Sequence, residues 1–254
     1  MQRRAPRVRY HAAAIAASRA ALATALKYLL CYPFTALMLA ILDLLLAAGL
    51  RRAVPAGCAF WARALFLLAG RPLHVYGLDA VDAGRPYLLV ANHSSMYDIP
   101  ALMAAFPALA LVGRERLTRI PLLRYFLRST RFIPIDTGSI RSAGEAIDAA
   151  VARGREGCTV AMFPEGTRTL TGSVQRLKRG FVRVLRESGL DLLPVRIDGT
   201  FRLAPKGRRY LDPAERITLV ARRPLHNRDL VRLSDEEIIT RAGDELSRRG
   251  DVQS

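Results

Sequence analysis

Residues 87–103 read YLLVANHSSMYDIPALM, and the rest of the chain is organised around this stretch. Its first five residues form an apolar run typical of a buried strand. The segment from residue 99 onward favours a helix, because Pro100 is tolerated in a first helical turn and disfavours helical angles in the residue before it. His93 and Asp98 lie between these two segments. The stretch therefore predicts a strand–loop–helix unit that carries a histidine and a carboxylate in its loop.

The spacing of His93 and Asp98 limits where the helix begins. Residues five apart do not share a helix face, so the pair does not lie in mid-helix. Asp98 is then the helix cap, or Ser95 is the cap and Asp98 stands three positions later. Either placement puts Asp98 at the positive end of the helix, which favours the ionised carboxylate. Two interpretations remain open: a general base with its orienting carboxylate, or a loop histidine beside a capping residue.

Strand and helix patterns alternate from residue 71 onward, which indicates an α/β core with a mostly parallel central sheet flanked by helices. We predict that residues 71–254 form one catalytic domain. Pro134 places its strand at a sheet edge or at a strand end. A helix is predicted where Val174, Leu177, Phe181 and Leu185 recur. Strands are predicted at residues 73–76, 87–91, 108–112, 131–136, 158–163, 192–197 and 217–221.

Residues 1–70 are predicted to form a membrane-associated helical appendage. Residues 29–50 are almost wholly apolar and would reach about 33 Å as a helix at about 1.5 Å per residue, close to a bilayer core of about 30 Å. Asp43 opposes a simple span, at about 2.5–3.5 kcal/mol at the bilayer centre. The segment either spans once or lies in the membrane interface. The alternative is a buried hairpin inside a soluble core.

The composition points to acidic or membrane partners. The chain has 254 residues, a formal charge of +17 and 51% hydrophobic residues, with a mean hydropathy of +0.13. The charge suits anionic lipids, phosphorylated substrates or nucleic acid. Aromatic residues make up only 7% of the chain, so we expect a membrane and no nucleic acid as partner. The three cysteines and four histidines have no metal-ligand spacing, and we expect buried free thiols and no metal.

A second polar motif follows another predicted strand. Residues 163–168 read FPEGTR and bring together Glu165, Gly166, Thr167 and Arg168. The guanidinium could bind a phosphate bidentately while the glycine lets backbone amides approach it. The alternative is a turn with a local Glu–Arg pair. Because functional groups gather beyond the carboxyl ends of parallel strands, this motif and the His93 loop are expected at the same edge of the sheet.

These motifs together resemble the glycerolipid acyltransferase family, specifically the 1-acylglycerol-3-phosphate acyltransferases. The resemblance covers residues 73–223. It rests on Asn92-His93 with Asp98, which is the family's N-H-x-x-x-x-D block, on the F-P-E-G-T-R block, and on the hydrophobic-proline block Leu193-Pro194-Val195.

The resemblance implies transfer of a fatty acyl group from acyl-CoA or acyl-carrier protein to the free hydroxyl of a lysophospholipid, giving phosphatidic acid from 1-acylglycerol-3-phosphate. The thioester is a co-substrate, and no cofactor is implied. His93 would be the general base and Asp98 its partner. The residues expected to bind substrate are Asn92, Asp136, Arg141, Glu165, Gly166, Thr167 and Arg168. The enzyme would lie at the cytoplasmic face of the bacterial inner membrane, anchored by its N-terminal helices. Its oligomeric state stays open.

One family block departs from the pattern. The family's G-x-x-F-I-D-R sequence aligns with residues 131–137, where Asp136 matches but Thr137 replaces the final arginine. The resemblance implies that this arginine contacts the acceptor's phosphate. Arg141 or Arg131 would substitute for it, or the acceptor is another lysolipid such as a lyso-ornithine lipid.

Overall fold

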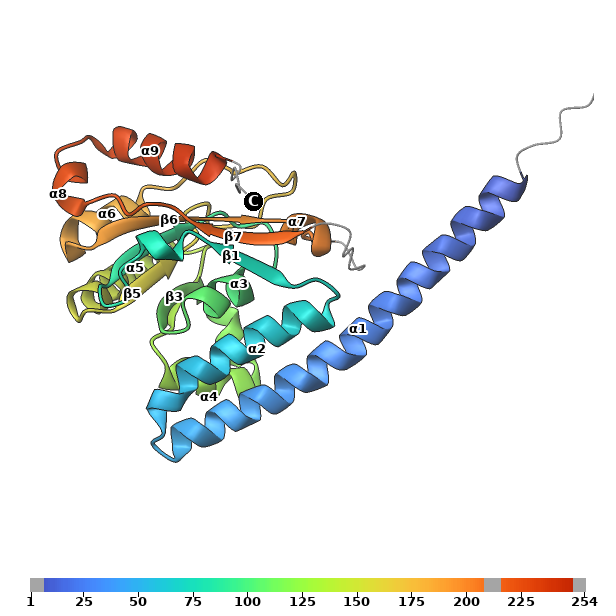
Figure 1. Ribbon diagram of the computed structural model, residues 1–254. Helices are drawn as coiled ribbons and strands as arrows, with labels where there is room; N and C mark the ends of the chain where they lie inside the picture. Colours follow the sequence, from blue (N-terminus) through green and yellow to red (C-terminus); the bar gives the residue numbers. More distant parts are fainter. Residues whose placement is uncertain (1–6, 208–215, 249–254) are drawn as a thin grey trace, which may run out of the picture.

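A computed structural model describes residues 7–207 and 216–248 of the chain. It contains a seven-stranded sheet covered by helices on both faces, and a long N-terminal helix that runs along one side and extends past the body of the protein (Figure 1). The prediction of an α/β fold with a helical N-terminal appendage is confirmed. The helices are α1 (Arg7–Ala47), α2 (Val54–Leu68), α3 (Asp98–Ala105), α4 (Pro121–Ser129), α5 (Ile140–Arg155), α6 (Gly180–Ser188), α7 (Thr200–Leu203), α8 (Asn227–Leu230) and α9 (Asp235–Ser247), with short 3₁₀ turns η1 (Arg51–Ala53), η2 (Leu78–Ala80) and η3 (Glu115–Arg119).

The strands are arranged in the order β1-β7-β6-β2-β5-β3-β4. Five neighbouring strands, from β6 to β4, are parallel, whereas β7 is antiparallel to β6 and carries β1 parallel to itself. The sheet is therefore mostly parallel, as predicted. Its strands are β1 (Leu73–Tyr76), β2 (Tyr87–Ala91), β3 (Leu109–Arg114), β4 (Ile133–Ile135), β5 (Thr159–Met162), β6 (Asp191–Asp198) and β7 (Ile217–Ala221).

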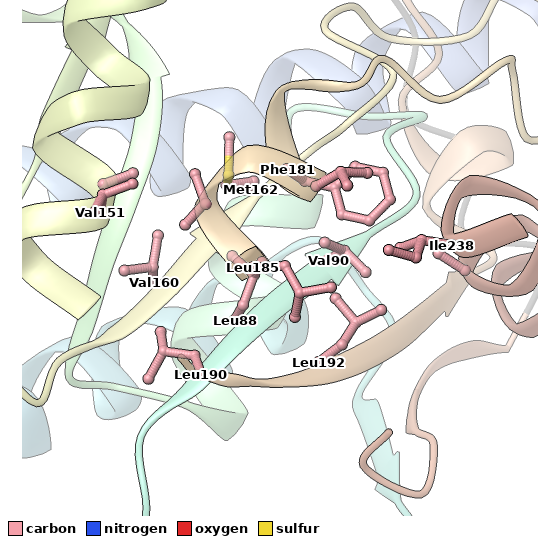
Figure 2. Packing of buried hydrophobic residues seen from close by; sticks show 14 of the residues in the cluster. Leu88, Val90, Val151, Val160, Met162, Phe181, Leu185, Leu190, Leu192 and Ile238 are labelled. Carbon is pink, nitrogen blue, oxygen red and sulfur yellow. The ribbon is translucent and has the colours of Figure 1, made fainter. Parts of the chain in front are cut away.

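Both faces of β2 are buried, which explains its continuous apolar sequence. Leu88 and Val90 point to the face covered by α5, α6 and α9. Figure 2 shows them beneath Phe181 and Leu185 of α6. Leu89 belongs to the opposite core, which α2 and α3 cover. Burial on two faces holds β2 at the middle of the sheet, between β6 and β5.

The helix predicted from Val174 is shorter than the sequence pattern indicated. α6 begins only at Gly180. The segment before it is irregular because its amides are used elsewhere: Gln175 N donates to the Glu165 carboxylate, and Lys178 N donates to Pro164 O. These bonds compete with the helical ladder, so the site overrides local periodicity.

From Thr24 to Ala47, the N-terminal helix keeps most of its apolar surface outside the protein core. One face of α1 packs Leu42 and Leu46 against α2 and α4. Leu29, Leu37 and Leu44 are 68%, 59% and 69% exposed. The stretch Thr24–Ala47 is long and apolar enough to cross a membrane, and only 22% of its most apolar window is buried. The structure therefore does not contain the buried hairpin of a soluble core.

Strand order places the two sequence motifs side by side. β2 pairs with β5 through Val90 and Met162, and with β6 through Ala91 and Val195. All three strands run in the same direction, so their carboxyl ends meet at one edge of the sheet. The loop after β2, the loop after β5 and the corner after β6 converge at this edge.

Candidate active site

His93 follows the end of β2 and pairs with Asp98. Its Nδ1 lies 2.9 Å from Asp98 Oδ2. Because an ionised carboxylate only accepts hydrogen bonds, Nδ1 is the donor, and the lone pair of the neutral ring is on Nε2. Phe163, at the end of β5, stacks on the imidazole with 4.1 Å between ring centroids. The side chain is 17% exposed, so a small reactive group can reach it.

Asp98 is fully buried and turned back toward its own loop. Its Oδ2 also accepts from Ser94 N at 2.6 Å and Ser95 N at 2.7 Å. α3 begins at Asp98 itself, with Tyr97 as the cap residue. The predicted start at an Asp98 cap was wrong, whereas the bonds of the Ser95 placement are present just ahead of the helix: Ser95 Oγ accepts from Tyr97 N at 3.3 Å, and the Asp98 carboxylate accepts from Ser95 N. The carboxylate closes a loop of amides ahead of the helix instead of capping the amides within it, although Asp98 does lie in the first turn as expected.

A third residue on the dyad was missed by sequence reasoning. Thr200, fully buried at the start of α7, places its hydroxyl 2.6 Å from Asp98 Oδ1. It stands 102 positions from Asp98. The sequence did place Thr200 just after the end of the strand predicted at residues 192–197. Because the carboxyl ends of parallel strands meet, that position could have identified Thr200 as a site residue.

Asn92 connects the His93 loop to β6. Its amide nitrogen donates to Ile197 O at 2.8 Å, and its oxygen accepts from Ile197 N at 2.7 Å. Both polar atoms of this buried side chain are therefore used to hold β2 against β6. Direct contact between Asn92 and substrate stays a prediction, while the structure gives the side chain a supporting role.

Glu165 is buried and connects the two sequence motifs. One carboxylate oxygen accepts from His93 N at 2.7 Å. The other accepts from the backbone and side-chain nitrogens of Gln175, both at 3.0 Å. Burial raises the pKa of Glu165, and the hydrogen bonds from His93 and Gln175 oppose that shift. With both oxygens bonded to protein, Glu165 positions the loop that carries His93; its contact with substrate stays a prediction.

Gly166 and Thr167 form the partly buried turn of the second motif. Gly166 has φ +72°, and a Cβ there would lie 2.7 Å from Lys178 Nζ. Lys206 Nζ lies 3.5 Å from the Thr167 hydroxyl. Two lysines from separate segments therefore flank this turn, which increases its positive charge.

Arg168 lies in a positive environment close to the dyad. Burial lowers the pKa of its guanidinium, as do the charges of Arg114 and Arg116, whereas Asp98 raises it. Arg114 ends β3, the strand next to β5, and Arg116 follows in η3. No carboxylate forms a salt bridge with these three arginines among residues 7–207 and 216–248. We call Arg114, Arg116 and Arg168 the arginine group. Unpaired like charges at a sheet edge favour an anionic ligand.

The residues of the divergent family block lie farther along the sheet. Asp136 follows β4, which is the outermost strand and lies three places from β2. At about 4.8 Å per strand, the axes of β4 and β2 are about 14 Å apart. Asp136 accepts from Gly138 N, and Arg141 is exposed in an ion pair with Glu145. Arg131 precedes β4 and so lies at the amino-terminal end of that strand, whereas the His93 loop lies at the carboxyl ends of the parallel strands. The structure therefore does not bring Arg131 to the site, and a role for Asp136 or Arg141 in binding stays a prediction.

The His93 loop also contacts the N-terminal helices. Tyr97, the residue before Asp98, is buried and lies with its ring 5.7 Å from that of Phe66 on α2. Its hydroxyl interacts with the thiol of Cys31 on α1. Burial, foremost, raises the pKa of Tyr97. The apolar appendage is thus packed directly against the segment that carries the dyad.

The cysteines take no part in the site. Cys31, Cys58 and Cys158 are free and buried, as predicted. In the described ranges, no three His, Cys, Asp or Glu side chains are grouped in a way that could hold a metal ion.

Comparison with known proteins identifies acyltransferases among the relatives of this chain. A family model described as Acyltransferase matches residues 72–198. A chloroplastic 1-acyl-sn-glycerol-3-phosphate acyltransferase of Arabidopsis thaliana is 23% identical over 155 residues, covering 61% of this chain and 44% of the relative. A 1-acyl-sn-glycerol-3-phosphate acyltransferase of Borreliella burgdorferi is 29% identical over 134 residues, covering 52% of this chain and 54% of the relative. The chain thus spans about half the length of these curated relatives.

A solved structure is similar over nearly the whole chain. The crystal structure of the 1-acyl-sn-glycerophosphate acyltransferase PlsC from Thermotoga maritima aligns with a TM-score of 0.74 and 26% identity. The alignment covers 92% of this chain and 98% of that one. The similarity therefore extends well beyond residues 72–198, which the family model matches.

Proposed function

Because this chain belongs to the acyltransferase family, we propose that it transfers a fatty acyl group from a thioester donor to the free hydroxyl of a lysophospholipid. The proposed acceptor is 1-acylglycerol-3-phosphate, the product is phosphatidic acid, and the donor is acyl-CoA or acyl-carrier protein. The observation that carries the proposal is the position of the His93–Asp98 pair, within electrostatic reach of Arg168 and its unpaired neighbours. A base for a hydroxyl thus stands beside a site for a phosphate.

The proposed chemistry is direct acyl transfer. His93 Nε2 accepts the proton of the acceptor hydroxyl as its oxygen attacks the thioester carbonyl. Asp98 holds Nδ1–H and stabilises the imidazolium that forms. As the tetrahedral intermediate collapses, the C–S bond breaks and the imidazolium returns its proton to the thiolate. The nearby serines are poor candidates for a covalent route, because the Ser94 hydroxyl bonds Thr200 and the Ser95 hydroxyl donates to Ala204 O.

The arginine group supports a phosphate-bearing acceptor despite the loss of the family arginine at Thr137. Arg114 and Arg116 reach the environment of Arg168 from β3 and its following turn. Guanidinium groups bind phosphate oxygens through paired, charge-assisted hydrogen bonds. We propose that Arg168 binds the acceptor's phosphate and that these two arginines supply the charge that Thr137 lacks.

Membrane association fits the same reaction, because both the acceptor and the product are membrane lipids. The exposed apolar surface of α1 would lie in or across the bilayer, and the contacts of Tyr97 would keep the catalytic loop close to that surface. We place the enzyme at the cytoplasmic face of the bacterial inner membrane, where acyl thioesters are available.

Acyl transfer by the full chain in lipid vesicles tests the proposed function. With oleoyl-CoA or oleoyl-carrier protein as donor, we expect lysophosphatidic acid to be converted to phosphatidic acid faster than lysophosphatidylcholine or a lyso-ornithine lipid is acylated. The products would be identified by mass spectrometry. Transfer to the lyso-ornithine lipid alone would overturn the acceptor, and no transfer from either thioester to any acceptor would overturn the reaction class.

Replacing Arg168 by alanine should weaken binding of the phosphate-bearing acceptor. A hydrogen bond to a charged group contributes about 1.5–3 kcal/mol, so the KM for lysophosphatidic acid should rise about 10- to 100-fold. Because Arg168 binds a group remote from the reacting hydroxyl, kcat should change less than KM. Initial rates over a range of acceptor concentrations measure both constants.

Arg228→Ala is the matched control for loss of one positive charge. Arg228 is exposed in α8, which lies near the start of β6 and so at the end of that strand opposite to Thr200. Its replacement should leave the KM unchanged. A monoacylglycerol, which lacks the phosphate, should be used equally poorly by the wild type and by R168A. An equal loss of both acceptors in R168A would show that Arg168 does not recognise phosphate.

A further inference from the structure

Among the described residues, the hydroxyl of Thr200 is the one hydrogen-bond partner of the Asp98 carboxylate that comes from outside the His93 loop. Thr200 Oγ1 lies 2.6 Å from Asp98 Oδ1, and the threonine is fully buried. Resting on the proposed function, we infer that Thr200 is a positioning residue that holds the Asp98 carboxylate aimed at His93. Its role would be exerted through the carboxylate, without contact with substrate.

The count of donors and acceptors gives these hydrogen bonds a direction. Asp98 Oδ2 accepts from three N–H groups, those of His93 Nδ1, Ser94 and Ser95. Asp98 Oδ1 accepts from Thr200, whose single hydroxyl proton is thereby used. The hydroxyl of Ser94, 3.0 Å from Thr200 Oγ1, must then donate to it. An ordered chain runs from Ser94 to Thr200 to Asp98, and such chains polarise each bond toward the charged end.

The backbone at the end of β6 fixes where this hydroxyl stands. Gly199 has φ +83°, and a Cβ at this position would lie 2.3 Å from Arg216 O. The corner therefore requires glycine, and Thr200 follows directly from it. Asn92 clamps Ile197 of the same strand to the catalytic loop through two hydrogen bonds. Thr200 is thus held by rigid backbone on one side and by the loop on the other.

Thr200→Val tests the inference by removing the hydroxyl while keeping the shape of the side chain. Hydrogen bonds donated to a carboxylate favour its ionised form. Without the Thr200 donor, the coupled His93–Asp98 pair should bind a proton more readily. The acid limb of the plot of kcat/KM against pH should therefore move to higher pH by about one pH unit. We expect kcat to fall about 10- to 100-fold with little change in the acceptor KM. Thr200→Ser keeps the hydroxyl and should restore the wild-type limb.

Thr159→Val provides the matched control. The hydroxyl of Thr159 accepts from Tyr87 N at 3.2 Å, at the opposite end of neighbouring strands. The same chemical change there should leave kcat and the acid limb in place. Should T200V not fold, Ser94→Ala carries the test. It removes the donor to Thr200 and should move the limb in the same direction by a smaller amount.

The outcomes separate this inference from the proposed function. An inactive wild type, or a fully active His93→Ala variant, would overturn the function on which the inference rests. An active wild type that requires His93, together with a folded T200V that keeps the wild-type rate and acid limb, would overturn the inference alone. Equal loss in T200V and T200S, or no shift in S94A where that variant replaces T200V, would also overturn it.

Discussion

Replacing His93 by alanine is expected to reduce acyl transfer by about 10²- to 10⁴-fold, the usual contribution of a positioned general base. The imidazole is the group of the dyad that is partly exposed, and Asp98 and Phe163 hold it in one orientation. Removing it leaves no group beside Asp98 to accept the hydroxyl proton. Initial rates with lysophosphatidic acid and acyl-CoA measure the loss, and binding to vesicles should be unchanged.

Asp98→Asn separates charge from shape within the same experiment. The amide oxygen of asparagine can still accept from Ser94 N and Ser95 N, so the loop should keep its form. The imidazolium loses its counter-charge, and we expect a loss of activity within the range expected for His93→Ala. Retained turnover in both variants would contradict the proposed roles. A covalent acyl-enzyme that forms and turns over competently would contradict direct transfer.

The chain contains its own control for this test. His226 Nδ1 lies 3.1 Å from Asp191 Oδ2, which reproduces the chemistry of the His93–Asp98 pair at the start of β6. His226→Ala should leave acyl transfer intact. Loss of activity there as great as in H93A would show that the assay reports on folding and not on the base.

Replacing Glu165 by alanine is expected to disrupt folding and catalysis together. The carboxylate is the acceptor for His93 N and for two nitrogens of Gln175. Each buried donor left without a partner costs about 1–3 kcal/mol, so E165A should lose at least that much in its free energy of unfolding. The remaining folded protein should transfer acyl groups slowly, because the loop that aims His93 has lost its support. Urea unfolding and initial rates measure the two effects.

Glu165→Gln should have a free energy of unfolding and an initial rate between those of wild type and E165A. The amide oxygen can replace one carboxylate oxygen as acceptor, while the amide nitrogen faces a donor and cannot bond to it. Glu156→Gln is the matched control, because Glu156 is 54% exposed and forms only a surface pair with Arg153. Such pairs contribute about 0–1 kcal/mol. If E165A were as stable as wild type and lost only affinity for the acceptor, Glu165 would be a binding residue, as the sequence resemblance had implied.

Much of the site was predictable because its two motifs are local. Residues 92–98 and 163–168 each follow an apolar run, and the rule for parallel sheets brings such ends to one edge. The structure confirms that the two loops meet, through the bond between Glu165 and His93 N. Individual roles were less predictable. Asn92 and Glu165 were expected to contact substrate, which stays a prediction; the structure adds that their polar atoms bond to Ile197, His93 and Gln175.

By itself, the sequence determined the elements whose cause lies within a few residues. The buried run of β2 follows from local composition, as does the edge strand that contains Pro134, which was one of the two placements predicted for it, and the structure confirms both. The apolar surface of α1 is also a local property.

Only the tertiary structure decided which distant groups complete the site. Strand order brings Thr200 to Asp98 from 102 positions away and gathers Arg114 and Arg116 near Arg168. It also stopped the helix predicted from Val174, because Gln175 N bonds to Glu165. Periodicity records only the neighbours of a residue along the chain, whereas these bonds depend on which strands lie side by side. The free energy of burying a carboxylate with its donors then overrides the local preference.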